Sequence, residues 1–378
     1  MAYQTNQHLY TQTKDLLHQF HKGGLPDHLL NTLAMMITGL FLGRHVQLWD
    51  IAVWVPLPIQ LTSLVRRFER FIADPRVVVG VFFKPFVLAC IATLGNDTAY
   101  LIIDCTQAGQ KCRTLVVGLA YHGTILPLAW QTSKGKKGHL KGECHRALLQ
   151  QVYPYLHLHR RVIVLGDAEF SNEPVIRWLL SVGWDFVLRF QHSYLLQTQP
   201  DVAWQAAADL AQGVGLRAGQ VRHWEDLSYT QEHQIPGLTV TVNWGEHEVE
   251  PWYLVSSLPA SEAPHLLYPR RFWIETLFGH HKSRGFQLAR THLTEPAQID
   301  RLVLALAIAT YITLGLGTDL IVTGQTKFVD RTDRRDLSLF QLGWRYLYRL
   351  LALDRLVAFK IRFRWDIKLP PAGFQAAQ

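Results

Sequence analysis

Hydrophobic periodicity predicts helices toward both ends of the chain. Residues 1–97 are expected to be helical, with apolar positions at helical spacing clearest from Leu29 to Leu42. A short basic helix is predicted over residues 60–72, opened by a Thr or Ser cap. A long apolar helix is predicted from Pro296 to Leu316. Its charge-free run is too short to span a bilayer comfortably, so we expect it to be buried inside the protein.

Shorter apolar runs predict a sheet in the middle of the chain. Three antiparallel strands are expected first, followed by a helix, a strand, a second helix and a fifth strand. This order is that of an RNase H-like α/β core. The expected strands are 99–104, 113–121, 126–132, 161–167 and 185–190, with a turn at His122 and Gly123. The expected helices are 139–153, ended by Pro154, and 174–182.

A change of charge then marks an insertion in this core. Residues 191–265 have a net charge of −7, although the chain as a whole has +8 and a pI of about 9.3. The segment is expected to hold a helix at 202–212 and strands at 220–224, 238–244 and 252–258, so it predicts a β-rich module. The expected domains are a helical N-terminal DNA-binding region (1–97), the core in two parts (98–190 and 266–320) around the insertion (191–265), and a basic helical C-terminal region (321–378).

Composition narrows the class of protein. Hydrophobic residues make up 48% of the chain and include 12 tryptophans, which argues against disorder and allows a large core. The positive charge favours a polyanionic partner such as DNA. The four cysteines follow no zinc or disulfide spacing, and the first residues lack an apolar signal core. We therefore expect a cytoplasmic, nucleoid-associated protein with no membrane partner.

Two acids end apolar strands of the predicted core. Asp104 and Asp167 each follow a hydrophobic run, and Glu275 lies on a later helix. A buried carboxylate is costly unless it is paired, hydrogen-bonded or bound to a metal, although a single strand-end Asp is more often a loop cap. Three convergent acids can hold two Mg²⁺ ions for an in-line phosphoryl displacement.

The most informative run of the chain lies between Tyr268 and Lys282. On a continuous α-helix over 269–284, closed by Gly285, each residue turns about 100° around the axis. Arg271, Glu275 and Lys282 then lie roughly 60°, 20° and 40° from Tyr268, within one narrow face. A phenol, a guanidinium, a carboxylate and an ammonium on one face predict one anionic ligand, best matched by phosphate with a divalent metal.

These four residues carry a resemblance to a known family. Their spacing, Y-(2)-R-(3)-E-(6)-K, is similar to the signature of bacterial insertion-sequence DDE transposases of the cut-and-paste group numbered four. The two strand-end acids stand in contexts similar to the family's, Ile-Ile-Asp-Cys-Thr and Leu-Gly-Asp-Ala-Glu-Phe. The resemblance covers about residues 55–320. The long gap between Asp167 and Glu275 fits the family's β-rich insertion.

The resemblance implies a transposase that cuts double-stranded DNA at terminal inverted repeats and joins it to target DNA. Relatives of this type free the element through a hairpin intermediate, and a homodimer is expected in the synaptic complex. Asp104, Asp167 and Glu275 would be the catalytic metal ligands for two Mg²⁺ ions, with Mn²⁺ as a substitute.

The resemblance also implies a set of DNA contacts. Arg271 and Lys282 would bind phosphates near the cut, and Tyr268 would contact DNA beside a flipped base. A tryptophan of the insertion would stack on that base, with Trp244 and Trp252 as candidates.

The basic helix of the N-terminal region suggests a further DNA contact. Arg66, Arg67 and Arg70 could lie on phosphates in a DNA groove, or they could form a solvated face of a packing helix, and the residues favour neither.

Two other functions remain possible from the sequence alone. One is an RNase H-like metal nuclease such as a resolvase, which a strand-transfer assay would distinguish. The other is a DNA-binding protein derived from a transposase without catalysis, against which the intact acids argue.

Overall fold

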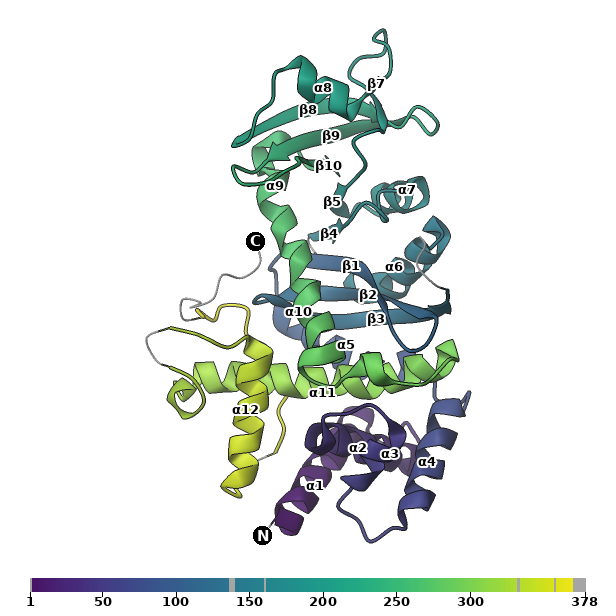
Figure 1. Cartoon of the computed structure of the whole chain (residues 1–378), viewed down its shortest axis with the longest axis vertical. Helices are drawn as coiled ribbons and strands as arrows, with labels where there is room; N and C mark the ends of the chain where they lie inside the picture. The colour runs from purple at the N-terminus through teal and green to yellow at the C-terminus, as the bar shows by residue number, and fades with distance from the viewer. Residues whose placement is uncertain (1, 136–139, 160, 332–333, 357, 370–378) are drawn as a thin grey trace.

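The computed structural model describes residues 2–135, 140–159, 161–331, 334–356 and 358–369. The molecule is elongated, with the insertion at one end, the N-terminal helices at the other, and the predicted core between them (Figure 1). The long helix α11 (Pro296–Val322) lies between the core sheet and the N-terminal helices and packs against both.

The core is built on five strands in the order β3-β2-β1-β4-β5. The first three form an antiparallel meander, whereas β1, β4 and β5 are parallel and are joined through helices. This arrangement confirms the predicted RNase H-like fold. The strands are β1 (Ala99–Gln107), β2 (Cys112–Tyr121), β3 (Thr124–Lys134), β4 (Val162–Gly166) and β5 (Asp185–Arg189), and the connecting helices are α6 (Gly142–Leu156) and α7 (Glu173–Ser181).

The insertion extends the same sheet. Strand β10 pairs antiparallel with β5, and the remaining strands continue outward to give ten strands in one sheet. The β-rich character expected from the sequence is therefore present as an extension of the core. Its elements are β6 (Leu195–Gln197), β7 (Gln205–Ala206), α8 (Ala207–Gly213), β8 (Gln220–Tyr229), β9 (Ile235–Trp244) and β10 (Trp252–Ser256).

Helices pack on both sides of the core strands and at the N-terminal end. Helix α6 packs against β2 and β3, whereas α10 (Trp273–Gly279) and α11 pack against β3. Most of α11 is buried, as predicted, so its apolar run is explained by the core. The N-terminal helices are α1 (Ala2–His21), α2 (Asp27–Gly43), α3 (Leu48–Val53), α4 (Leu61–Ala73) and α5 (Val79–Leu94).

The C-terminal helix α12 (Leu339–Ala352) crosses α11 at very close range. A Cβ atom on Gly343 would lie 1.8 Å from the carbonyl oxygen of Thr313, and one on Gly317 would lie 2.4 Å from that of Leu339. Glycine at both positions therefore lets the two backbones touch. Ser338 caps α12 through a reciprocal capping box with Gln341.

Three local predictions were wrong. Helix α6 continues through Pro154 to Leu156, because a proline in the last turn removes few helical hydrogen bonds. Helix α4 starts after Gln60, with no side-chain cap from a Thr or Ser. In the insertion, α8 begins only at Ala207. The predicted start of α6 at His139 lies outside the described residues.

The run from Tyr268 to Arg284 is also not one α-helix. It comprises a 3-10 segment η2 (Tyr268–Phe272), the α-helical α10, and a π-helical turn η3 (His280–Arg284) that ends before Gly285. The short segments α9 (Pro264–Leu267), η1 (Ala260–Glu262), η4 (Leu288–Arg290) and η5 (Thr326–Phe328) complete the described elements. Because each helix type turns by a different angle, the constant helical periodicity assumed from the sequence does not describe this run.

Candidate active site

Parallel pairing brings the two strand-end acids side by side. Strands β1 and β4 are in register with Ile103 beside Gly166, so the residues that follow, Asp104 and Asp167, lie at the same edge of the sheet. This edge is where the strands of open α/β sheets commonly present functional groups. Asp104 is 9% exposed, and its Oδ1 accepts a hydrogen bond from the amide of Cys105 at 2.7 Å.

Arg271 connects all three predicted acids. Its Nη2 lies 3.1 Å from Oδ2 of Asp104 and 3.2 Å from Oδ2 of Asp167, and its Nη1 donates to Oε1 of Glu275 at 2.8 Å. The 3-10 turn of η2 places Arg271 over the strand ends, and α10 then carries Glu275 one helical turn further. Three acids separated by long stretches of sequence thus converge on one guanidinium. We call this group the acid cluster.

Burial and mutual repulsion shift the pKa values within the acid cluster. Burial raises the pKa of Asp104 to about 6; Arg271 acts against the shift, whereas Asp167 and Glu275 reinforce it. Burial also opposes the charge of Arg271, but Asp104, Tyr268 and Asp167 outweigh it and raise the Arg271 pKa. The carboxylates therefore hold the guanidinium tightly, and they are poised to accept further positive charge.

The residues of the acid cluster suit a hard divalent cation. Carboxylate oxygens are the ligands that Mg²⁺ and Mn²⁺ prefer, and here two come from adjacent strand ends and a third from α10. Within the described residues no three His, Cys, Asp or Glu side chains already form a metal-binding group. Instead, the guanidinium of Arg271 bridges the three acids. A metal at this site would compete with Arg271 for the same oxygens.

Lys282 approaches the acid cluster from the π-helical turn. Burial lowers its pKa, and the negative charge of Asp104 and the nearby Cys105 act in the opposite direction. The π-helical turn follows α10 directly and is half-buried at Lys282. Such turns within helices often occur at functional sites. Lys282 therefore lies close enough to Asp104 for the two charges to influence each other.

The three aromatic residues predicted to contact DNA, Tyr268, Trp244 and Trp252, lie in different surroundings. Tyr268 is 1% exposed, so its phenol is not on the surface face expected from the sequence. Trp252 packs edge-on against it, with ring centroids 5.3 Å apart, and also lies near Phe272. Trp244, at the end of β9, instead donates its indole hydrogen to the carbonyl of Glu248. Of the two tryptophans, Trp252 is the one that contacts the run containing Arg271.

A buried ion-pair network centred on Glu169 lies behind Asp167. The carboxylate of Glu169 accepts from Arg113 at 3.2 Å and from the amide of Leu140 at 2.8 Å, and the residue's own amide donates to Oδ1 of Asp167. Burial alone would raise the Glu169 pKa, but His145, Leu140 and Arg113 together lower it to about 2. This charged group fixes the turn that presents Asp167. The pairing of residues 113 and 169 has no signal in the sequence.

The three arginines of α4 face different surroundings. Arg66 and Arg70 are exposed, whereas Arg67 is partly buried and its Nη1 lies 3.9 Å from the sulfur of Met35 on α2. Two of the three are therefore accessible to a nucleic acid, and Arg67 contributes to packing.

Comparison with known proteins identifies a family whose model matches this chain. A family model described as "Transposase DDE domain" matches residues 96–312, which include all three acids of the acid cluster. Among solved structures, the chain is similar to one titled "Cryo-EM structure of piggyBac transposase synaptic complex with hairpin DNA (SNHP)", at 11% identity and a TM-score of 0.44 over 92% of this chain and 77% of that one. No curated protein matches the chain.

Proposed function

Because this chain belongs to the family of transposase DDE domains, we propose that it cuts the ends of a mobile DNA element and joins them to target DNA. The observation that carries the proposal is the convergence of Asp104, Asp167 and Glu275 on one guanidinium at the edge of the sheet. Three carboxylates in this arrangement suit phosphoryl transfer with two divalent ions, Mg²⁺ or Mn²⁺. Bound there, the ions would activate the attacking hydroxyl and stabilise the leaving oxygen.

Each residue of the site has a proposed role. Asp104 and Asp167 hold the metals from the strand ends, and Glu275 completes the set from α10. With the carboxylates holding metal, Arg271 would bind a phosphate of the cut strand with its two-pronged guanidinium. Lys282 binds a neighbouring phosphate as a point charge. Glu169 and Arg113 keep the turn of Asp167 in place.

The spacing of Tyr268, Arg271, Glu275 and Lys282 supports assignment to the cut-and-paste group numbered four. The finer reaction then follows from that resemblance: cleavage at terminal inverted repeats and release through a hairpin. Trp252 is the better candidate for stacking on a flipped base, because it packs against Tyr268. Since an element has two ends, two copies of the chain are proposed in the complex that joins them.

The experiment uses the DNA that flanks the gene, containing the inverted repeats, as a labelled substrate with Mg²⁺. The wild-type protein should cut at the repeat ends and join them to a plasmid. Asp104→Asn, Asp167→Asn and Glu275→Gln should each lose cutting below detection while binding the ends, because affinity comes from Lys and Arg. Asp201→Asn, an exposed acid of the insertion, is the matched control.

The outcomes separate the rival functions. Cutting without joining would identify a metal-dependent nuclease. End binding without cutting by the wild type would identify a DNA-binding protein that lacks catalysis. Normal turnover by any one of the three acid variants would remove that residue from the site.

A further inference from the structure

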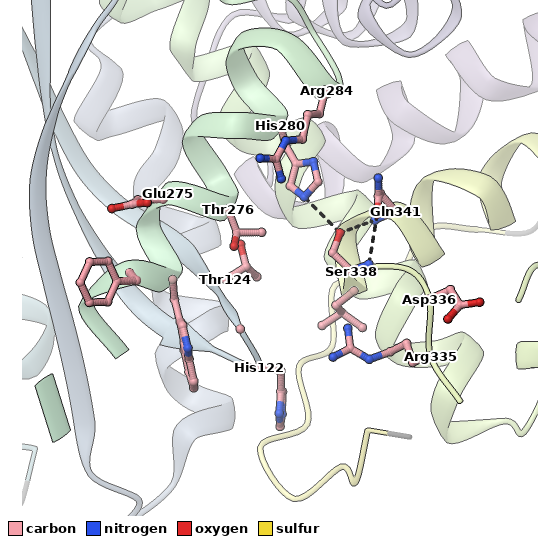
Figure 2. A pocket seen from close by; sticks show the side chains of 14 residues that line it. His122, Thr124, Glu275, Thr276, His280, Arg284, Arg335, Asp336, Ser338 and Gln341 are labelled. Carbon is pink, nitrogen blue, oxygen red and sulfur yellow. Dashed lines mark hydrogen bonds between the residues drawn. The ribbon is translucent and has the colours of Figure 1, made fainter. Parts of the chain in front are cut away.

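Two buried histidines of the turn η3 are tied to hydroxyl groups. His281 shares a hydrogen bond with Thr310 at 2.9 Å, and His280 shares one with Ser338 at 3.1 Å. His280 and Ser338 lie at the wall of a cavity of about 460 Å³ that Glu275 also borders (Figure 2). These hydrogen bonds offset the cost of burying two polar rings, so both histidines have a structural explanation.

A second pair of histidines lies where the insertion meets the segment that leads to Arg271. His223 is on β8 and His265 is on α9, and their ring centroids are 5.4 Å apart with an interplanar angle of 48°. Nδ1 of His223 lies 2.9 Å from the hydroxyl of Thr241, the residue opposite it on β9. Nδ1 of His265 is buried and has no hydrogen-bond partner among the described residues. One ring is therefore fixed in orientation, and the other has an unsatisfied nitrogen.

The distance between these two rings suits two ligands of one metal ion. Because Zn–N bonds are about 2.0–2.1 Å long, the centroid of a ligating imidazole lies about 3.2 Å from the ion. Two centroids 5.4 Å apart then enclose an angle of roughly 115° at the ion, which is close to tetrahedral. The bond from Nδ1 of His223 to Thr241 leaves Nε2 for the metal, and metal-bound histidines commonly use their other ring nitrogen in this way.

The surroundings keep both rings available as ligands. Burial lowers the pKa of His223, with Glu225 acting in the opposite direction, and burial together with His223 lowers the pKa of His265. Both imidazoles are therefore mainly neutral near pH 7, which is the form that binds metal. Glu225 is held in place by the amide of Ala260, which donates to its Oε1 at 2.6 Å. An ion between the two rings would have this carboxylate nearby to offset its charge.

We propose that His223 and His265 bind one transition-metal ion, best matched by Zn²⁺, with water completing its coordination. Imidazole nitrogens suit Zn²⁺, Ni²⁺ and Cu²⁺, whereas Mg²⁺ prefers oxygen ligands such as those of the acid cluster. Within the part of the chain that the structure describes, no third His, Cys, Asp or Glu side chain completes a metal-binding group. The ion therefore keeps open positions, unlike the ion of a closed structural zinc site.

The consequence of binding follows from the place of His265 in the chain. Helix α9 ends at Leu267, and η2 begins at the next residue and carries Arg271 over the acid cluster. An ion that joins His265 to β8 ties the start of this segment to the insertion. The site is separate from the acid cluster, so the inference does not rest on the proposed function.

The first test is thermal unfolding of the full-length protein in EDTA and in Zn²⁺. At about a hundred times its Kd, an ion at one site should raise the Tm of the 378-residue wild type by roughly 3 °C. His223→Asn and His265→Asn should each lose most of this rise, because each removes one of two ligands. His247→Asn changes an exposed histidine of the insertion and is the matched control, which should keep the rise. Each rise is measured against the same protein in EDTA, so any loss of stability from the substitution itself does not enter the comparison.

A second measurement identifies the ligands. With one equivalent of Cu²⁺, the electron paramagnetic resonance spectrum of the wild type should show coupling to two imidazole nitrogens, and that of His265→Asn to one at most. Equal rises in Tm for the wild type and His265→Asn, or Cu²⁺ spectra that neither substitution changes, would overturn the site. Loss of the rise in His247→Asn as well would also overturn it, because surface histidines would then account for the binding. No rise in the wild type would exclude the site and leave the proposed function unaffected, since that function needs only the acid cluster.

Discussion

Replacing Arg271 by alanine tests whether its guanidinium neutralises the acid cluster. The change removes the bridge between Asp104, Asp167 and Glu275 and leaves three carboxylates facing one another. Without added metal, the variant should be less stable than the wild type. With Mg²⁺, it should regain most of that loss, because the cation takes over the neutralising role.

The magnitude follows from how deeply each partner is buried. Glu275's side chain is 54% exposed, so this i,i+4 pair contributes only about 0.3–0.5 kcal/mol. Asp167's side chain is 34% exposed, and its pair contributes less than about 1 kcal/mol. Asp104, at 12%, dominates: removing the partner of a buried charge costs about 3–5 kcal/mol. Since the pKa of Asp104 is already about 6, it can take up a proton, which favours the lower limit of about 3 kcal/mol.

Thermal unfolding in EDTA and in excess Mg²⁺ provides the assay. At about 2.1 cal/mol/K per residue, the unfolding entropy of 378 residues is roughly 0.8 kcal/mol/K, so a loss of about 3 kcal/mol lowers Tm by roughly 4 °C. Mg²⁺ at about a hundred times its Kd would return about 2.7 kcal/mol. The wild type should gain less, because Arg271 competes for the same oxygens.

The neighbouring residue Arg270 provides the control for this experiment. Arg270→Ala removes an arginine that lies over the ring of Tyr100, 4.8 Å from its centroid, and should cost only about 0.5–1 kcal/mol with no added response to Mg²⁺. Equal Tm values for Arg271→Ala and the wild type in EDTA, or equal gains from Mg²⁺, would refute the reasoning.

Four further predictions concern other parts of the molecule. Burial lowers the pKa of His281 to about 3. The stability that its neutral form contributes is therefore fully present above pH 6.5 and is lost as the pH falls toward 3. Between pH 8 and pH 5, the unfolding free energy of the wild type should therefore fall by roughly 2 kcal/mol more than that of His281→Gln. Denaturant titrations at the two pH values measure this difference. Lys282→Ala should reduce cutting through a loss of about 1.5–3 kcal/mol that high Mg²⁺ does not restore, and full activity would show that Lys282 contacts no phosphate. Arg66→Ala with Arg70→Ala should lower the salt slope of duplex binding by about 1.8, whereas Arg67→Ala, half-buried against Met35, should leave it unchanged; equal slopes for all three proteins would place these arginines off the DNA. Gly343→Ala should destabilise the protein by about 1–3 kcal/mol in denaturant titrations, because its Cβ would lie 1.8 Å from the carbonyl oxygen of Thr313; unchanged stability would show that α12 shifts freely.

The sequence was a good guide to the strands of the core and to the order in which they occur. Continuous apolar runs predict buried strands directly, and β1 to β5 all overlap the ranges expected from those runs. The long apolar helix was also predictable, because its composition leaves burial as its stable state. The helical prediction for the run after Tyr268 failed, because periodicity is a statement about one helix type and this run contains three.

Candidate acids could be named from sequence, but not their environment. Asp104 and Asp167 stand at the ends of apolar runs, which is a local signal, and Glu275 belongs to a spaced signature. That Arg271 bridges all three depends on the parallel register of β1 with β4 and on the 3-10 turn of η2. The contacts of Arg271 with Asp104 and Asp167 join residues more than a hundred positions apart, so no short window of sequence contains them.

The sequence by itself therefore determined the core strands, the long apolar helix and which acids stand at strand ends, because these depend on local hydrophobic patterns. Only the tertiary structure decided that Trp252 rather than Trp244 packs against Tyr268, that Glu169 pairs with Arg113, and that Glu275 borders a cavity shared with the segment before α12. Each of these is a contact between elements brought together by the sheet and by helix packing. Local propensity sets where a side chain can point, and packing sets what it meets there.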